Sequence, residues 1–447
     1  MQMIHSRLTT YSTYVIGYLI SFLLATSGHH YLAGITLMLV AILLYVQTFL
    51  NTKNIVNLKG LFSLSWIGGQ GIASLQLSEL QSNWNIMTWV CFFLAFIFFS
   101  LGFDFKKILK KEKNNPTNHM VEHAVLQSDV VAKKVFVCMV LLTGASIGCF
   151  VLEALVVGYI PLFSKLPHAY SYFHISGVHY FTISCILIPA LTVIYNRVVI
   201  TKDKITTVFI TICNTIAIAI PILCVSRFQL LFAVMFAVVV YLLIYKKITI
   251  KAILILFTIM ILAYVLLTVA RNHDITYLNG IFDMKYKKMP IFITQPYIYI
   301  ANNYENFNCM VNQISTHTYG LKMLFPVLAL TGLKFIFPQL TIFQAFITKK
   351  ELTTLTIFYD AYYDFGVIGI AVFAFLLGFI AYKLTKAIEN CTNPIMYLFY
   401  GQIAIYLALS FFTTWFSNPT TWFWIALTSI MYIYVGHNKN VKELESL

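Results

Sequence analysis

The chain contains few charged residues: Asp, Glu, Lys and Arg make up 10% of its 447 residues, whereas 60% are hydrophobic. The mean hydropathy is +0.80, and apolar runs of about 17 to 25 residues recur from one end of the chain to the other. This composition excludes a soluble globular protein. It predicts an all-α, polytopic integral membrane protein, because a helix needs about 20 apolar residues to cross a bilayer.

Several familiar sequence signatures are also absent. The chain has no CxxC pair, no phosphate-binding P-loop, no HExxH zinc motif, no GxSxG motif and no paired acids of the DxD type. Its 8 cysteines are scattered, so they indicate neither a disulfide framework nor a metal site. These absences argue against an ATPase and a nucleotide-sugar enzyme, and we expect neither a metal ion nor a cofactor.

The apolar runs predict about twelve transmembrane helices in a single transmembrane domain of residues 1–447. If the N-terminus is cytoplasmic, about two thirds of the 30 Lys and Arg residues fall in cytoplasmic loops, as the positive-inside rule requires. We therefore predict that both termini are cytoplasmic. The predicted helices cover about residues 11–28, 31–50, 61–77, 85–103, 135–157, 177–196, 205–225, 228–245, 251–270, 366–382, 395–414 and 420–435.

One long extracytoplasmic loop, residues 271–365, separates the ninth and tenth predicted helices. A structureless segment of this length is unusual in a compact protein, so we expect the loop to form part of an active site. Within it, residues 323–338 form an apolar run that Pro326, Gly332 and Pro338 interrupt. A re-entrant or interfacial helix fits this run better than a thirteenth span, which would reverse the side of the basic residues after it.

An arginine stands between the seventh and eighth predicted helices, at the outer face, in the sequence SRFQLLF. Ser226 is a natural N-cap for the eighth helix. The free N–H groups and the positive dipole end of that helix add to the charge of Arg227, which makes an anion site suited to phosphate. The alternative is that Arg227 only anchors the turn among lipid headgroups.

Two further polar residues lie at the outer ends of predicted helices. Glu153 falls in the outer part of the fifth helix, where a carboxylate should be paired or protonated. Arg227 and Arg271 are candidate partners for it. His179 begins the sixth helix on the outer side, where a capping or interfacial histidine is the ordinary explanation.

The long loop carries residue types that can bind sugars or move protons. Tyrosine rings stack on sugars and asparagine amides hydrogen-bond to hydroxyls, but Tyr is enriched at every membrane interface and Asn-rich loops are usually just solvated. Histidine and carboxylate side chains are candidates for proton transfer. The residues that we single out are Arg271, His273, Tyr299, Asn303, Tyr304, Glu305, His317, Asp360 and Tyr363.

The order of several short sequences resembles a known family. GYIPLF and ISGVHYFTIS follow the fifth predicted helix, SRFQLLF forms the outer turn, YIANNYENFN lies in the long loop, and FYDAYYDFGVIGI leads into the tenth helix. In this order, over about residues 60–435, they resemble the Wzy-type polymerases of O-antigen and capsule repeat units. The resemblance implies a metal-independent membrane glycosyltransferase of the GT-C kind.

Such an enzyme moves a growing glycan from undecaprenyl diphosphate onto an incoming lipid-linked repeat unit at the outer face of the bacterial cytoplasmic membrane. The implied partners are lipid-linked oligosaccharides, the bilayer, a chain-length regulator and a flippase, with no nucleic acid. Arg227 and Arg271 are the best candidates to bind the diphosphate. The general-base candidates are His273, His317, Glu305 and Asp360. The substrate-binding candidates are Ser226, Glu153, His179, Tyr299, Asn303, Tyr304 and Tyr363.

Two other functions remain open. A ligase-type transferase has the same architecture and differs only in its acceptor. A lipid-linked oligosaccharide flippase or another transporter suits twelve helices, but a transporter should show two similar halves. The loop of residues 271–365 has no counterpart in the first half of the chain, and this asymmetry favours an enzyme that works at one face.

Overall fold

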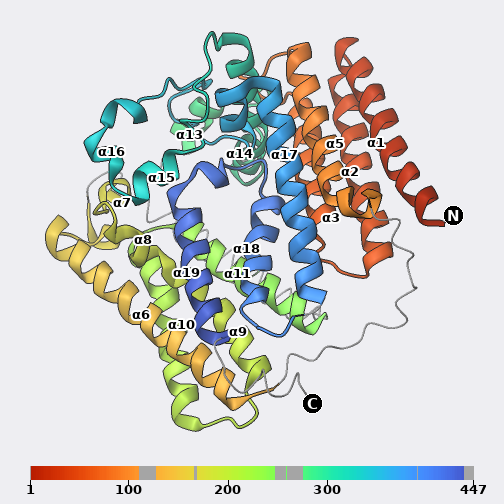
Figure 1. The fold of residues 1–447 in the computed structure, drawn as a ribbon. Coiled ribbons are helices and arrows are strands. Elements are labelled where there is room, and N and C mark those ends of the chain that lie inside the picture. Colours follow the sequence, from red (N-terminus) through yellow and green to blue (C-terminus); the bar gives the residue numbers. More distant parts are fainter. Residues whose placement is uncertain are drawn as a thin grey trace. The chain divides into compact units, whose positions relative to one another are not determined.

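The computed structural model describes residues 2–109, 127–165, 169–246, 258, 275–389 and 391–436 (Figure 1). All regular structure in this part of the chain is helical. Contacts between residues divide the chain into two compact units. That these units form a single transmembrane domain of residues 1–447 stays a prediction. Unit 1 comprises Met1–Asn115, Asp274–Thr385 and Tyr406–Trp422, and unit 2 comprises Pro116–His273, Lys386–Ile405 and Phe423–Leu447.

Unit 1 is built around buried aromatic rings. Trp66 is fully buried, and its ring centroid lies 5.4 Å from those of both Phe92 and Tyr304. The helices of unit 1 are α1 (Gln2–Thr26), α2 (His30–Thr52), α3 (Leu58–Phe62), a π-helix (Ser63–Ile67), α4 (Gly68–Ser74), α5 (Ile86–Leu109), α13 (Ile275–Phe282), α14 (Ile291–Gln313), α15 (Phe325–Leu330), α16 (Leu333–Ile336), a 3₁₀ turn (Pro338–Thr341), most of α17 (Tyr359–Glu389) and a second 3₁₀ turn (Trp415–Ser417).

Unit 2 packs long helices against one another with short connections. A mid-helix 3₁₀ stretch, Ile183–Leu187, joins α8 to α9, and its side chains are buried. The helices of unit 2 are α6 (Asp129–Val157), a 3₁₀ turn (Pro161–Phe163), α7 (Ala169–Tyr172), α8 (Val178–Thr182), α9 (Ile188–Val198), α10 (Lys204–Leu223), α11 (Arg227–Tyr245), most of α18 (Met396–Ala408) and most of α19 (Pro419–Gly436).

Seven helical segments among the described residues are long and apolar enough to cross a membrane, so the chain is a polytopic membrane protein. Each overlaps a predicted span, because apolar runs of this length are read directly from the sequence. The segments are His30–Thr52, Ile86–Lys106, Asp129–Val157, Val178–Val198, Lys204–Leu223, Arg227–Tyr245 and Tyr359–Glu389.

The other five predicted spans are not among these seven segments, and the count of twelve stays a prediction. Residues 11–28 lie mostly in α1, and residues 61–77 are divided among α3, the π-helix and α4. Residues 395–414 contain the shorter apolar helix α18, and residues 420–435 lie within α19. The predicted ninth span, residues 251–270, falls almost entirely outside the described residues.

The long segment before α17 contains several helices. The longest is α14, in which Asn and Tyr residues are buried. The apolar run of residues 323–338 forms two short helices, α15 and α16, separated at Gly332, whose φ is 78°. With six and four residues, neither reaches the roughly 20 residues that a membrane-spanning helix needs.

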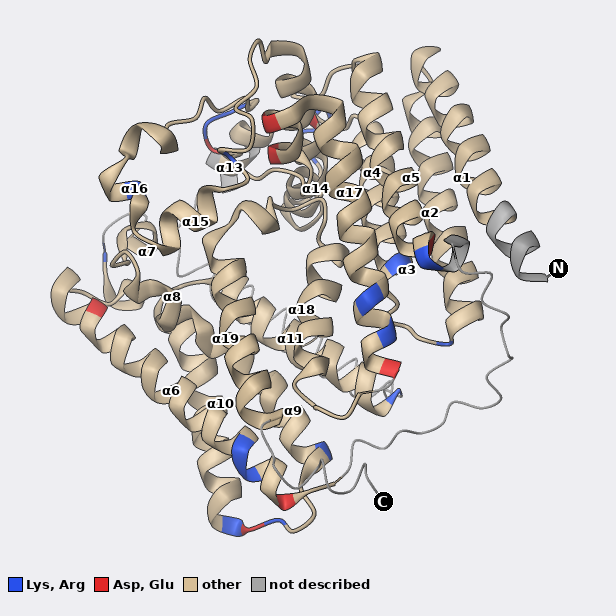
Figure 2. Cartoon of the chain, viewed as in Figure 1, with Lys and Arg blue, Asp and Glu red and all other residues tan. Residues whose placement is uncertain are grey.

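The helix directions in unit 2 sort its charged residues into two ends. A hydrogen bond of 2.9 Å from Ser128 N to Val198 O joins the start of α6 to the end of α9. We call this the basic end, and Figure 2 shows Lys and Arg residues gathered at these helix termini. The opposite end carries Glu153, His179 and Arg227. The basic end carries Lys133, Lys134, Arg197, Lys202, Lys204 and Lys246.

Candidate functional site

A buried carboxylate and a histidine form a pair in unit 2. Glu153 lies near the end of α6, and its side chain is completely buried. The Thr182 hydroxyl and the Ile175 N–H donate hydrogen bonds to it, at 2.8 and 2.9 Å. His179 Nδ1 lies 3.0 and 3.1 Å from its two carboxylate oxygens. Glu153 is therefore paired, as its depth in a predicted helix requires.

His179 is held so that one edge of its ring stays accessible. It lies in the first turn of α8, which begins after Gly177, whose φ is 88°. The His179 side chain is 27% exposed, whereas that of Glu153 is 0% exposed. Because Nδ1 faces the carboxylate, Nε2 is the ring nitrogen that can meet a substrate. A carboxylate on Nδ1 fixes the orientation of the ring, which suits His179 to take up a proton.

The turn between α10 and α11 positions Arg227. Val225 has a φ of 52°, which is rare for a β-branched residue, and its side chain is buried with Leu230. Leu162 and Tyr170 pack against these two residues. The Ser226 hydroxyl accepts a hydrogen bond of 3.4 Å from Gln229 N, which confirms the predicted N-cap. Arg227 is therefore fixed as the first residue of α11.

Arg227 and the Glu153–His179 pair lie at the same end of unit 2. Side chains of the segment 159–178 pack on the turn before Arg227, and a backbone N–H of the same segment binds Glu153. One end of unit 2 thus combines a cation at a helix N-terminus, which suits an anion, with a histidine that can accept a proton.

A second cluster of charged residues lies in unit 1, beside the start of α17. Asp360 is 4% exposed, and Lys322 Nζ lies 3.8 Å from its Oδ1. The same ammonium group is 4.8 and 4.9 Å from the ring centroids of Phe343 and Tyr363. The two rings and the carboxylate together hold the Lys322 cation, which is 19% exposed.

Two further residues tie this cluster to the segment before α15. Asp364 accepts hydrogen bonds from the Thr318 hydroxyl and from the backbone N–H groups of Lys322 and Met323, the latter two at 3.1 and 2.8 Å. His317 Nδ1 lies 3.1 Å from the Tyr363 carbonyl oxygen. The cluster thus brings together three residues that the sequence singled out, His317, Asp360 and Tyr363.

Four of the five asparagines of α14 are buried, and most of their polar atoms hydrogen-bond to the chain itself. Asn303 donates 2.7 Å hydrogen bonds to the carbonyl oxygens of Tyr299 and Phe411 and accepts one of 2.6 Å from the Thr354 hydroxyl. The Tyr304 hydroxyl donates to the Trp66 carbonyl oxygen at 2.9 Å. Both side chains are 0% exposed, so their polar atoms already serve the fold.

Glu305 is also enclosed in α14. The Ser82 hydroxyl and Asn308 Nδ2 donate hydrogen bonds to its Oε1, at 2.6 and 3.1 Å. Burial raises the pKa of Glu305 from its usual value of 4.5, although these hydrogen bonds and one from the Trp84 indole lower it. The carboxyl is 2% exposed and has no open face toward a substrate.

The remaining candidates are placed as follows. Tyr299, on α14, is 36% exposed and lies beside Phe412, with 6.3 Å between the ring centroids. Arg271 and His273 lie outside the described residues. The general-base and substrate-binding roles of all these residues stay predictions.

Sequence reasoning missed Lys322 and the partners of Glu153. Lys322 stands in a long loop with seven other basic residues, and nothing local marks it as the one beside Asp360. Ile175 and Thr182 stand close to His179 in the sequence, so the sequence shows hydrogen-bond donors on both sides of this histidine. The sequence does not show that both donors bind Glu153, because Glu153 lies 22 to 29 residues earlier in the chain.

Comparisons of the chain with models of known families, with curated proteins and with solved structures find no match.

Proposed function

We propose that the chain is a membrane-embedded glycosyltransferase that polymerises lipid-linked oligosaccharide repeat units. The observation that carries the proposal is the Glu153–His179 pair at the same end of unit 2 as the α11 N-terminus with Arg227. Transfer from a diphosphate carrier needs a base for the acceptor hydroxyl and a cation for the leaving group. This end of unit 2 supplies both.

The proposed topology has twelve transmembrane helices, with both termini in the cytoplasm of a bacterium and the chain in its inner membrane. The basic end of unit 2 supports this orientation, because short cytoplasmic loops carry an excess of Lys and Arg. The opposite end, with Glu153, His179 and Arg227, then faces the periplasm or the cell exterior. Lipid-linked repeat units are available on that side after a flippase has moved them across.

In the proposed reaction, His179 Nε2 takes the proton of an acceptor hydroxyl on the incoming repeat unit. The hydroxyl oxygen forms a new bond to the anomeric carbon of the growing glycan, and the bond from that carbon to the diphosphate oxygen breaks. Undecaprenyl diphosphate leaves with the electron pair, and Arg227 with the N–H groups at the start of α11 stabilises its charge. Glu153 stabilises the imidazolium that forms. A chain-length regulator would act on the product.

The first experiment compares the loss of Arg227 with the loss of another basic residue of unit 2. In a host strain without its chromosomal copy, we expect Arg227→Ala to reduce the surface glycan from a ladder to single repeat units. Arg227→Lys should retain short products, because lysine keeps the charge but not the two-pronged hydrogen bonding of arginine. Lys165→Ala, an exposed residue of the same unit, is the matched control and should leave the ladder unchanged.

Membrane extracts must contain equal amounts of each variant for this comparison. An unchanged ladder in Arg227→Ala would show that the arginine only anchors the turn. A full ladder in the deletion strain would remove the polymerase proposal altogether. Long polymer that stays on its lipid carrier would indicate a ligase instead.

A further inference from the structure

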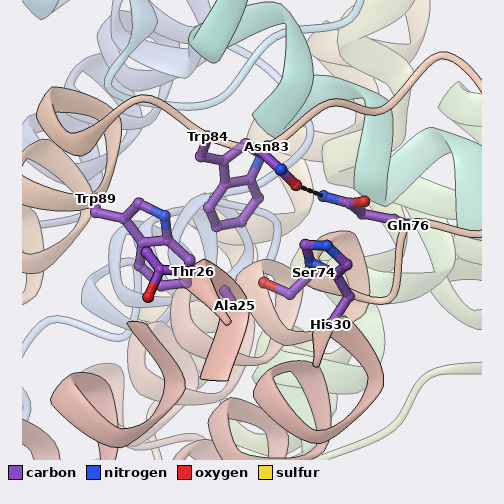
Figure 3. Close-up of a pocket in the computed structure, with 8 residues that line it drawn as sticks. All are labelled: Ala25, Thr26, His30, Ser74, Gln76, Asn83, Trp84 and Trp89. Atoms are coloured by element: carbon purple, nitrogen blue, oxygen red, sulfur yellow. Dashed lines mark hydrogen bonds between the residues drawn. The ribbon is translucent and has the colours of Figure 1, made fainter. Parts of the chain in front are cut away.

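A pocket of about 200 Å³ opens in unit 1, between the α1–α2 turn and the loop before α5. The end of α1 and the starts of α2 and α5 surround it, together with the last residue of α4. Figure 3 shows two indole rings, of Trp84 and Trp89, on one side and the side chains of Gln76 and His30 on the other. None of the candidate residues from the sequence lines this pocket.

The two indoles form a rigid apolar wall. Their ring centroids are 5.1 Å apart and their planes are inclined by 56°. Trp89 is 5% exposed, and the rings of Tyr18 and Phe22 contact it edge-on, at 5.5 and 5.6 Å. Such a wall offers flat aromatic surface at little entropic cost, because the neighbouring rings already fix its side chains.

Gln76 and Asn83 offer the pocket hydrogen-bonding groups without charge. Gln76 has a φ of 48°, and its amide nitrogen donates to the Ser82 carbonyl oxygen at 3.0 Å and to Asn83 Oδ1 at 3.3 Å. This leaves the Gln76 amide oxygen and the Asn83 amide nitrogen for a ligand. Both amides are held in place by their mutual bond.

One polar atom of the pocket wall is buried and lacks a partner. Ser74 is 4% exposed, and its hydroxyl has no hydrogen-bond partner in the described part of the chain. It points toward the side of the pocket that the indoles form (Figure 3). A buried hydroxyl without a partner is costly, so a ligand that hydrogen-bonds to it would gain free energy.

From this lining we propose that the pocket binds one neutral sugar ring. The indole rings suit the apolar face of a sugar, and the amides and hydroxyl suit its hydroxyl groups. No Lys, Arg, Asp or Glu is among the described residues that line the pocket, which disfavours a phosphate or a lipid headgroup. At about 200 Å³ it is smaller than the roughly 300–1,000 Å³ of sites for drug-sized ligands, and a single ring fills it.

The pocket is a sugar subsite of the glycan substrate only if the proposed transferase function is correct, but its affinity for a sugar is independent of that function. On the predicted topology it opens at the outer face, because the α1–α2 turn follows the first crossing from the cytoplasm.

The test is saturation-transfer NMR on the purified, detergent-solubilised chain. The probes are the methyl glycosides of glucose, galactose and N-acetylglucosamine, with glycerol phosphate as the headgroup probe. Thr26, which lines the pocket, and Ser27, which does not, are both exposed and both donate a hydroxyl hydrogen bond to the Leu23 carbonyl oxygen, at 3.0 and 2.8 Å. Thr26→Phe therefore fills the pocket, and Ser27→Phe is the matched control.

We expect at least one glycoside to show a saturable signal in the wild type and in Ser27→Phe, and at least a tenfold weaker signal in Thr26→Phe. Asn83→Ala, which removes an exposed amide and leaves the fold in place, should weaken binding several-fold. The proposal is overturned if no glycoside gives a signal, if both phenylalanine variants bind alike, or if glycerol phosphate binds and the glycosides do not. The two proposals can fail separately. If a glycoside binds but deletion of the gene leaves the glycan ladder intact, the sugar-binding proposal stands and the polymerase proposal is wrong.

Discussion

In unit 1 the buried amides of α14 form their hydrogen bonds with the chain itself, whereas in unit 2 the buried Glu153 holds a histidine whose ring is partly exposed. Both arrangements give most of their buried polar groups hydrogen-bond partners, as burial demands. They differ in what remains for a ligand. The side-chain N–H groups of Asn303 and Asn306 donate to carbonyl oxygens of the chain, whereas His179 has a second ring nitrogen, Nε2, that does not face Glu153.

The comparison shows that a polar residue type is a weak guide to function in a membrane protein. The asparagine-rich sequence of α14 contains the residue types expected of a sugar site, yet most of its amides bond to the loops around it. Glu153 lies among apolar residues near the end of α6, yet it contacts the partly exposed, titratable ring of His179. The α14 amides and the Glu153–His179 pair differ in whether a hydrogen-bonding group stays accessible to a ligand.

The largest expected effect comes from breaking the pair in unit 2. Glu153→Gln keeps one oxygen, which can accept from the Ile175 N–H, and places an amide NH2 beside the Thr182 hydroxyl, but it cannot stabilise a charged imidazole. We expect polymerisation to fall by about 10² or more, with normal insertion. The measurement is the rate of chain growth with purified protein and lipid-linked repeat units.

A double-variant cycle sharpens this prediction. If Glu153 acts through His179, then Glu153→Gln in a His179→Gln background should cost little more. Additive losses would mean that the two residues act separately, and a fully active Glu153→Gln variant would contradict a role in proton transfer.

An intermediate effect, on stability, is expected from the buried amides of unit 1. Asn306 donates to the carbonyl oxygens of Leu352 and Thr354, at 2.8 and 3.0 Å, and accepts from Thr348 N at 2.9 Å. Asn306→Leu leaves these buried groups without partners, at a cost of about 1–3 kcal/mol each. Thermal unfolding of the chain in detergent should begin at a clearly lower temperature.

The matched control is Asn312→Leu in the same helix. Asn312 is exposed, and it accepts a hydrogen bond of 2.8 Å from Asn85 Nδ2 at the surface, where water can replace it, so the unfolding temperature should shift only slightly. Equal shifts in both variants would mean that helix propensity, and not the buried hydrogen bonds, governs the stability of this region.

The smallest effect is expected from Glu305 and depends on pH. Because its pKa is raised in the folded protein, the protonated form is favoured there, and its contribution to stability is complete below the unfolded pKa and is lost as pH rises through the folded pKa. Glu305→Gln copies the protonated form. Above pH 4.5 the variant should lose less stability than the wild type as pH increases, measured by thermal unfolding between pH 5 and pH 8. Parallel curves would show that Glu305 is charged in the folded protein.

Much of the fold was predictable from the sequence. Seven apolar segments of α2, α5, α6, α8 to α9, α10, α11 and α17 coincide with predicted spans. Ser226 was predicted as the N-cap of α11, because capping depends on residues three positions apart. The predicted span of residues 61–77 corresponds to an uninterrupted helical run over residues 58–74, which contains a π-helical stretch at Ser63–Ile67 beside the buried Trp66.

The candidate site was predictable only in part. The sequence showed that Glu153 needs a partner, because the cost of an unpaired carboxylate is a local property of its apolar helix. It could not show that the partner is His179, since 26 residues and a chain reversal separate the two. The pocket with Trp84 and Trp89 left no sequence signal either, because its walls come from four separate segments.

The sequence by itself determined that this protein is helical and lies in a membrane, because hydropathy and helix capping act over one helix at a time. Only the tertiary structure decided which polar residues keep hydrogen-bonding groups for a ligand. Burial depends on what packs around a side chain, and those neighbours come from distant parts of the chain. A side-chain amide therefore stabilises the fold in α14, at Asn303, whereas the same type of group forms part of a pocket wall at Gln76.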